Sequence, residues 1–166
     1  MINVNIFIRK KSNNHHHSVE RFAESLKKSY FKNLKINIKR CPLTSKGLIN
    51  RIYLIFWAYF NQGDVNHILG DINYISLLMK KSKTINTFLD CRLLNEFSGV
   101  KKIIYKLLWF EYPIKNSTFV TYISNFTRSE IEKKIIKKNY TYVIPVPLSK
   151  NLSFKINKNI KKKVLI

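Results

Sequence analysis

Two kinds of apolar segment alternate along this chain, and this alternation constrains the fold more than any other feature. Short segments rich in β-branched and aromatic residues predict strands, and longer segments with apolar residues at i, i+3, i+4 and i+7 predict helices. The predicted strands are 4–8, 34–38, 64–69, 84–89, 118–123 and 142–146. The predicted helices are 18–31, 45–60, 71–79, 100–110 and 127–138, with Ser18, Asp71 and the capping box Thr127-Arg128-Ser129-Glu130 at three of their N-termini.

Strands that alternate with helices in this way predict an α/β fold. We expect a Rossmann-like, doubly wound parallel sheet of about six strands with helices on both faces, formed by residues 1–148. Residues 149–166 are polar and basic and are expected to be a linker. Because such sheets bind ligands beyond the carboxyl ends of their strands, the loops 9–17, 67–73 and 90–98 are the expected site.

Composition limits the partners and the location. The 31 basic and 9 acidic residues give a net charge of +22, which predicts attraction to nucleic acid, an anionic membrane or phosphorylated substrates. The lysines occur in every segment, so an ordinary solvated surface is the alternative. The longest apolar run, 52–60, is too short to span a bilayer, and Arg9 and Lys10 follow the first apolar stretch, the reverse of a signal peptide. These features predict a cytoplasmic protein.

Several enzyme classes lack their motifs in this sequence. The four glycines form neither GxGxxG nor a P-loop, which argues against nicotinamide, flavin and nucleoside-triphosphate enzymes, and a serine-hydrolase elbow is absent. Cys41 and Cys91 have no zinc-binding spacing, so no metal and no cofactor are expected.

Polar residues stand out in the three loops where ligands are expected. His17 precedes a predicted helix, His67 and Asp71 interrupt an apolar strand and its exit, and Asp90 ends the fourth predicted strand. A carboxylate at residue 90 could orient a hydroxyl or act as a general base. The alternatives are a solvated loop for His17, a buried hydrogen-bonded histidine for His67, and helix or turn caps for Asp71 and Asp90.

Five segments, in order, resemble bacterial glycosyltransferases of family 4 (group 1), which have the GT-B fold. HSVERF at 17–22 resembles the family's FSIER segment, if His17 is taken as its first residue. GDVNHILGDINYISL at 63–77 resembles D-V-N-H-I-T-G-D-x-H-Y, and KTINTFLDC at 83–91 resembles K-T-I-L-T-I-H-D-C. LLWFEYPIKNSTFVTYISNFTRSEI at 107–131 resembles L-W-x-x-x-P-x-K and T-x-I-S-E-x-T-K-x-E, and VIPVP at 143–147 resembles V-I-P-N.

The resemblance implies specific site residues and specific departures from them. Asp90 is implied as the catalytic residue, and the residues implied to bind substrate or shape the cleft are His17, Glu20, His67, Asp71, Asn73 and Ser124. Leu89 stands where the family has the histidine of its H-D pair, Asn73 where it has another histidine, and Val146 where it has asparagine. Leucine in place of the histidine at position 89 argues against catalytic competence.

The resemblance also implies a function. The chain would be the acceptor-side half of an enzyme that transfers a sugar, without a metal, from a nucleotide-diphosphate sugar to a glycan or lipid-linked hydroxyl in surface-polysaccharide synthesis. We expect 149–166 to lead into a donor-binding domain that this chain lacks, and lysines to hold the protein on the inner membrane surface. The alternatives are a non-catalytic partner of a separately encoded donor domain and, less favoured, a basic nucleic-acid-binding protein.

Overall fold

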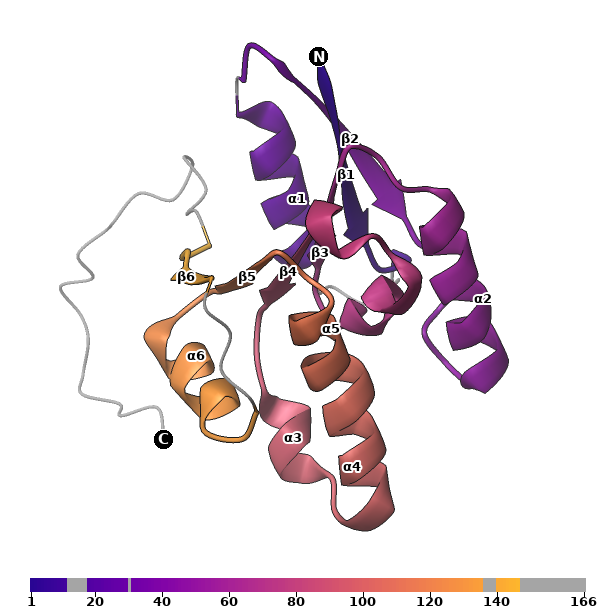
Figure 1. Ribbon diagram of the computed structural model, residues 1–166, viewed down its shortest axis with the longest axis vertical. Coiled ribbons are helices and arrows are strands. Elements are labelled where there is room, and N and C mark those ends of the chain that lie inside the picture. The colour runs from indigo at the N-terminus through magenta and orange to yellow at the C-terminus, as the bar shows by residue number, and fades with distance from the viewer. Residues whose placement is uncertain (12–17, 30, 136–139, 147–166) are drawn as a thin grey trace, which may run out of the picture.

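Six parallel strands form one sheet in the order β2-β1-β3-β4-β5-β6, seen in the computed structural model of the chain (Figure 1). The structure describes residues 1–11, 18–29, 31–135 and 140–146, so the predicted linker 149–166 lies outside the described residues. The strands are β1 (Ile2–Ile8), β2 (Leu34–Arg40), β3 (Val65–Leu69), β4 (Thr84–Phe88), β5 (Phe119–Tyr122) and β6 (Thr141–Val143). The predicted α/β class and Rossmann-like parallel sheet are confirmed.

Helices connect successive strands and cover the two faces of the sheet. They are α1 (Ser18–Lys28), α2 (Leu48–Phe60), the 3-10 helices η1 (Asn73–Leu78) and η2 (Lys81–Lys83), α3 (Arg92–Glu96), α4 (Gly99–Lys106), the π-helix η3 (Leu107–Glu111), α5 (Tyr112–Lys115) and α6 (Asn125–Glu132). No helix among the described residues is long and apolar enough to cross a membrane.

The register of the strands separates the core into two clusters. Register partners in a parallel pair point to the same face, and Phe7, Ile68 and Val120 share the face that packs against α2, η1, the helical run from α4 to α5, and α6. Ile6 and Leu69 point to the opposite face, which packs against α1. The sheet is therefore covered on both faces, with α1 as the one described helix on its second face.

The strand order creates a reversal between β1 and β3. The chain moves from β1 outward to β2 on one side, then returns to place β3 on the other side of β1 and continues toward β6. Connections on the two sides of β1 diverge, which leaves a crevice at the carboxyl ends of β1 and β3. The sheet topology thus places the expected ligand site there.

Several predicted element boundaries are wrong: the helix predicted over 18–31 ends at Lys28, α6 ends at Glu132 and β2 continues to Arg40. Asp71 does not cap a helix over 71–79, because a shorter 3-10 helix begins after Ile72 without a side-chain cap. Ser124, rather than Thr127, caps α6 by accepting a hydrogen bond from the Thr127 amide, and α2 begins at Leu48 after Gly47. The last strand ends at Val143 rather than 146; Pro145 lacks the amide that would continue the ladder.

The predicted helix 100–110 continues further than the sequence pattern indicated. A π-helical turn, η3, joins α4 to α5, and Pro113 lies in the first turn of α5. Proline removes one i→i−4 hydrogen bond and would clash with the preceding turn, and the wider π turn before it accommodates the break. The helical run therefore carries Trp109 and Phe110 on the side that faces the core.

Candidate functional site

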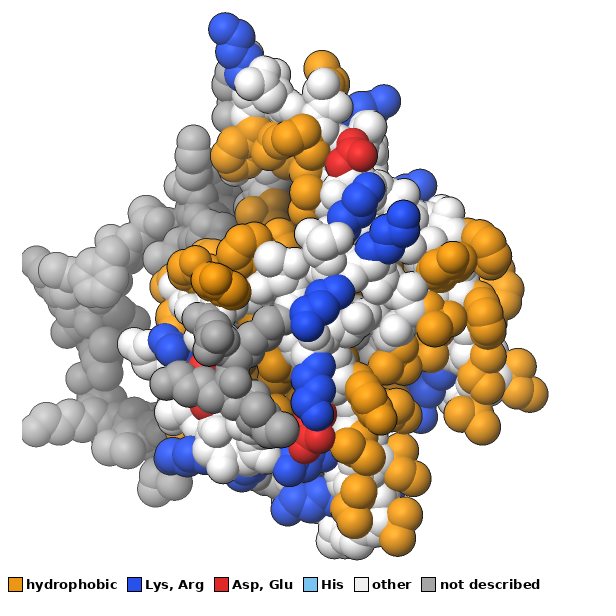
Figure 2. Space-filling model, in the orientation of Figure 1, with side chains coloured by type: hydrophobic (Ala, Val, Ile, Leu, Met, Phe, Trp, Pro, Cys, Tyr) orange, Lys and Arg blue, Asp and Glu red, His pale blue; other side chains and the backbone are white. Residues whose placement is uncertain are grey.

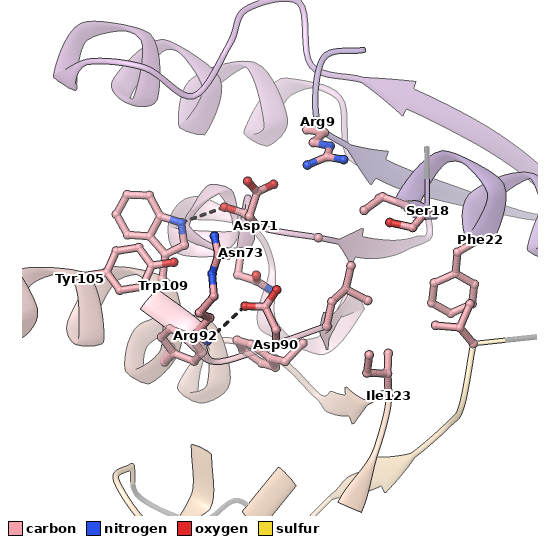
Figure 3. A pocket seen from close by; sticks show the side chains of 16 residues that line it. Arg9, Ser18, Phe22, Asp71, Asn73, Asp90, Arg92, Tyr105, Trp109 and Ile123 are labelled. Atoms are coloured by element: carbon pink, nitrogen blue, oxygen red, sulfur yellow. Dashed lines mark hydrogen bonds between the residues drawn. The ribbon is translucent and has the colours of Figure 1, made fainter. Parts of the chain in front are cut away.

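A cavity of about 600 Å³ opens at the carboxyl ends of the strands, at the reversal between β1 and β3 (Figure 3). Every strand of the sheet except β2 contributes its exit segment or last residue to the wall. The lining residues are Arg9, Ser18, Val19, Phe22, Gly70, Asp71, Asn73, Phe88, Leu89, Asp90, Arg92, Tyr105, Trp109, Phe110, Ile123 and Val146. All three loop regions expected to form the site contribute to this cavity.

Gly70 allows the chain to turn sharply from β3 into the cavity wall. Its φ of 95° lies in the left-handed region, and a Cβ there would lie 3.4 Å from Val19 of α1. A side chain at this position would be strained, since L residues rarely adopt such a φ. The turn exposes the side chain of the next residue, Asp71, while the Asp71 carbonyl accepts a 2.8 Å hydrogen bond from Trp109 Nε1.

Two carboxylates and two guanidinium groups face the cavity. Figure 3 shows Asp71 and Asp90 directed into it, with Arg9 on the side of Asp71 and Arg92 beside Asp90. The amide of Arg92 donates to Asp90 Oδ1 at 3.3 Å, and the Arg92 guanidinium is paired with Glu96 at 3.1 Å. The cavity therefore combines acceptors for hydroxyl groups with cations that suit anionic groups.

Glu20 lies behind the cavity wall rather than among its lining residues. It is only 7% exposed, and its Oε1 lies 3.7 Å from Nε of Arg9. Within the described part of the chain, neither of its carboxylate oxygens accepts a hydrogen bond. Glu20 is thus placed to hold Arg9 toward the cavity by charge.

Aromatic side chains form the wall of the cavity opposite α1 (Figure 3). Tyr105 stacks on Trp109 with ring centroids 4.7 Å apart, and Tyr74 contacts the same indole at 4.7 Å. The Arg51 guanidinium lies 4.8 Å from the centre of the Trp109 ring. Burial raises the pKa of Tyr74 to about 12, so its hydroxyl, hydrogen-bonded to Ser45, stays protonated at neutral pH.

His67 is not among the residues that line the cavity. Its Nε2 forms a 2.7 Å hydrogen bond with Thr87 Oγ1, which in turn bonds Thr121 Oγ1 at 2.6 Å, so a polar chain crosses from β3 to β5. Burial lowers the pKa of His67 to about 4, which makes the ring neutral at pH 7. The structure therefore separates His67 from Asp71, although the two are four residues apart.

Asn73 and Ser124 make internal hydrogen bonds. Asn73 lines the cavity, yet its Nδ2 donates to Asn86 Oδ1 at 3.0 Å and to the Thr87 carbonyl at 3.3 Å. Ser124 caps α6, and its neighbour Ile123 reaches the cavity instead. His17 lies outside the described residues. Of the predicted site residues, Asp71, Asn73 and Asp90 meet at one cavity.

Thiolate chemistry has no support at this site. Cys41 and Cys91 are free and buried. Burial raises the pKa of the Cys41 thiol to about 12, and burial together with the Glu130 charge raises the pKa of Cys91. No group of three or more potential metal ligands occurs among the residues that the structure describes.

Sequence reasoning missed the two arginines and the aromatic wall. Arg9 directly follows β1, and Arg92 follows Asp90 by two residues. Both arginines therefore lie where strands end, and the rule that strand exits form the ligand site applies to them as it does to the acidic residues. Tyr105 and Trp109 had no such signal, since their position depends on how the helical run from α4 to α5 packs. Neither a scan against models of protein families nor a search of curated proteins finds a match for this chain.

Proposed function

We propose that this chain is the acceptor-side domain of a glycosyltransferase, cytoplasmic and acting on a hydroxyl of a glycan or lipid-linked sugar in surface-polysaccharide synthesis. The observation that carries the proposal is the meeting of Asp71, Asp90 and two arginines in one cavity at the sheet reversal. Asp71 and Asp90 are also positions at which the sequence matches the resemblance described above.

Each side chain has a role in this proposal. Asp90 accepts the hydrogen bond of the acceptor hydroxyl and takes its proton as the oxygen forms a bond to the anomeric carbon of the donor. The bond from that carbon to the nucleoside diphosphate breaks, and the diphosphate leaves with the bonding electrons. Asp71 binds a second hydroxyl, and Arg9 and Arg92 suit phosphate groups because guanidinium pairs with them through two parallel hydrogen bonds. No metal takes part in this step.

The donor half would come from another domain, in the same chain or separately encoded. An apolar seam on β5 and β6, which reaches the cavity at one end, supports this part of the proposal. It consists of the exposed side chains Phe119, Tyr140, Tyr142, Ile144 and Val146, and Val146 reaches the cavity itself. A domain that closes over the cavity would cover this seam and exclude water from the reacting groups.

The test is acceptor binding by the full chain, measured by saturation-transfer NMR with soluble saccharides and a short-chain polyprenyl diphosphate sugar. Asp90→Asn is expected to weaken binding about 10- to 100-fold, the usual effect of losing a hydrogen bond to a charged group. Asp64→Asn is the matched control, because Asp64 lies at the amino end of β3 and bonds the Asn3 amide. Equal affinity for wild type and Asp90→Asn would contradict the assignment.

Two further titrations separate this function from its rivals. We expect weak or no binding of uridine, guanosine and cytidine diphosphate sugars, whose principal site would lie in the donor half. We also expect duplex DNA to bind weakly and to dissociate as salt is raised. Sequence-dependent DNA binding that survives 0.5 M salt would contradict the glycosyltransferase proposal.

A further inference from the structure

The outer face of α2 is apolar along its whole length. Its exposed large side chains are Leu48, Ile49, Ile52, Tyr53, Phe56, Tyr59 and Phe60. They follow the i, i+1, i+4, i+5, i+8 pattern of one helical stripe, while Leu54 and Ala58 on the opposite side are buried in the core. A helix that is apolar on both sides is normally buried, so this stripe indicates a surface that something else covers.

A second exposed apolar stripe lies on α4. Val100, Ile103 and Ile104 are exposed at i, i+3 and i+4, and the exposed Lys101 and Lys102 lie between them. Figure 2 shows apolar side chains gathered over α2 and, below it, over α4 on one side of the molecule. These two stripes are called the α2–α4 surface below.

The α2–α4 surface lies directly behind the cavity wall. Tyr105 at the end of α4 and Trp109 in η3 line the cavity from the helical run whose outer side carries Ile103 and Ile104. Arg51 of α2 lies over the Trp109 ring and so links α2 to η3, which continues from α4. Whatever covers this surface is therefore brought within one helix diameter of the cavity, about 10 Å.

The charged residues of α2 and α4 themselves are all basic. No acidic residue occurs from 40 to 63 or from 97 to 106, whereas Lys46, Arg51, Lys101 and Lys102 do. Arg40 and Lys106 lie in the same ranges but pair with Glu24 and Glu111. A second copy of the chain would bring its own net charge of +22 to the same contact, which opposes self-association. An anionic bilayer offers both an apolar interior for the stripes and negative head groups for the lysines.

We propose that the α2–α4 surface is a membrane-binding surface that inserts its apolar side chains into the interfacial layer of an anionic bilayer. α2 has 13 residues and is about 20 Å long, so it lies along the surface and does not cross the ~30 Å hydrocarbon core. The proposal depends on this surface alone. Together with the proposed function, it would bring a lipid-linked acceptor to the cavity.

Vesicle co-sedimentation of the full chain tests the proposal. Phosphatidylcholine vesicles with and without 30% phosphatidylglycerol are compared at 0.1 and 0.5 M NaCl. The test variant is Ile49→Gln with Phe60→Gln, which changes two side chains that are 83% and 79% exposed and leaves the core intact. The control variant is Phe31→Gln with Phe126→Gln, which changes exposed apolar side chains outside α2 and α4.

The wild type and the control are expected to bind the anionic vesicles, with part of the binding surviving 0.5 M NaCl. The test variant should lose at least about 10-fold in partition coefficient, as expected when one large apolar side chain no longer inserts. Equal binding of wild type and test variant would contradict the insertion of apolar side chains. The binding would then be explained by electrostatic attraction between lysines and lipid head groups alone. Failure to bind, with a dimer in light scattering that the test variant dissociates, would assign the surface to self-association. Soluble-acceptor binding should not change in the test variant, so failure of this proposal and of the proposed function are distinguishable.

Discussion

Replacement of Asn73 by alanine tests whether this residue serves the core or the ligand. Asn73 is 3% exposed and links η1 to β4 through hydrogen bonds to Asn86 Oδ1 and the Thr87 carbonyl. Asn86 continues the network by donating to Ser117 Oγ at 2.7 Å. Loss of two buried hydrogen bonds costs about 1 kcal/mol each, and an oxygen of Asn86 left without this donor adds a further ~1 kcal/mol. We therefore expect Asn73→Ala to lower the free energy of unfolding by about 3 kcal/mol.

Urea unfolding followed by circular dichroism at 25 °C measures this value, and the Tm should fall by roughly 9 °C at about 3 °C per kcal/mol. Asn125→Ala is the matched control, because Asn125 is exposed and should change stability by less than about 0.5 kcal/mol. The double variant Asn73→Ala/Asn86→Ala should be less destabilised than the sum of the single variants, since both remove the same bond. Additive effects, or a loss below 0.5 kcal/mol for Asn73→Ala, would refute a structural role for the network.

Three further measurements test the core, the helix cap and the partly buried histidine. Leu54→Ala, at a fully buried position on the inner face of α2, should lower stability by about 3 kcal/mol in urea unfolding, and a loss below 1 kcal/mol would contradict the packing of α2. Ser124→Ala removes the α6 cap and should cost about 1 kcal/mol, whereas Ser124→Asp should restore most of it. His67 has a pKa of about 4 when folded against an ordinary value of 6.5, so the unfolded chain binds more protons in that window and stability falls as the pH drops through it. The wild type should lose about 2 kcal/mol more than His67→Gln between pH 7 and pH 5; an NMR titration of His67 with a pKa near 6.5 would contradict this.

The sequence pattern was sufficient for the fold class because each strand prediction depended on local composition. The alternation of short β-branched segments with amphipathic ones marked all six strands, and helices between consecutive strands implied a parallel sheet. Element ends were less predictable where tertiary contacts decide them. Aspartate is a residue type that often caps helices, and the sequence therefore predicted a cap at Asp71. In the structure the Trp109 indole donates a hydrogen bond to the Asp71 carbonyl, and the chain continues into a 3-10 helix instead.

The candidate site was predictable to the extent that it depends on strand exits. Asp90 and Asp71 follow β4 and β3 directly, so the position of the strands determined the position of both carboxylates. His67 lies within β3, and its partner Thr87 is twenty residues away in the neighbouring strand. Nothing local to His67 indicates that bond, which is why the sequence left both an exposed ligand-binding histidine and a buried one open.

Leu89 belongs both to the cavity wall and to the core. It lines the cavity and also packs on the apolar cluster of Ile6, Ile8 and Leu69 under α1. A histidine at this position, as the resemblance implies for the family, would turn one edge toward the cavity and the other toward that cluster. Leucine packs on this cluster and offers no hydrogen-bonding group to the cavity, while Asp90 beside it lines the same cavity. Under the proposed function, leucine in place of a histidine at this position would affect transfer more than folding or acceptor binding, and acceptor binding is the property that the proposed function requires of this domain.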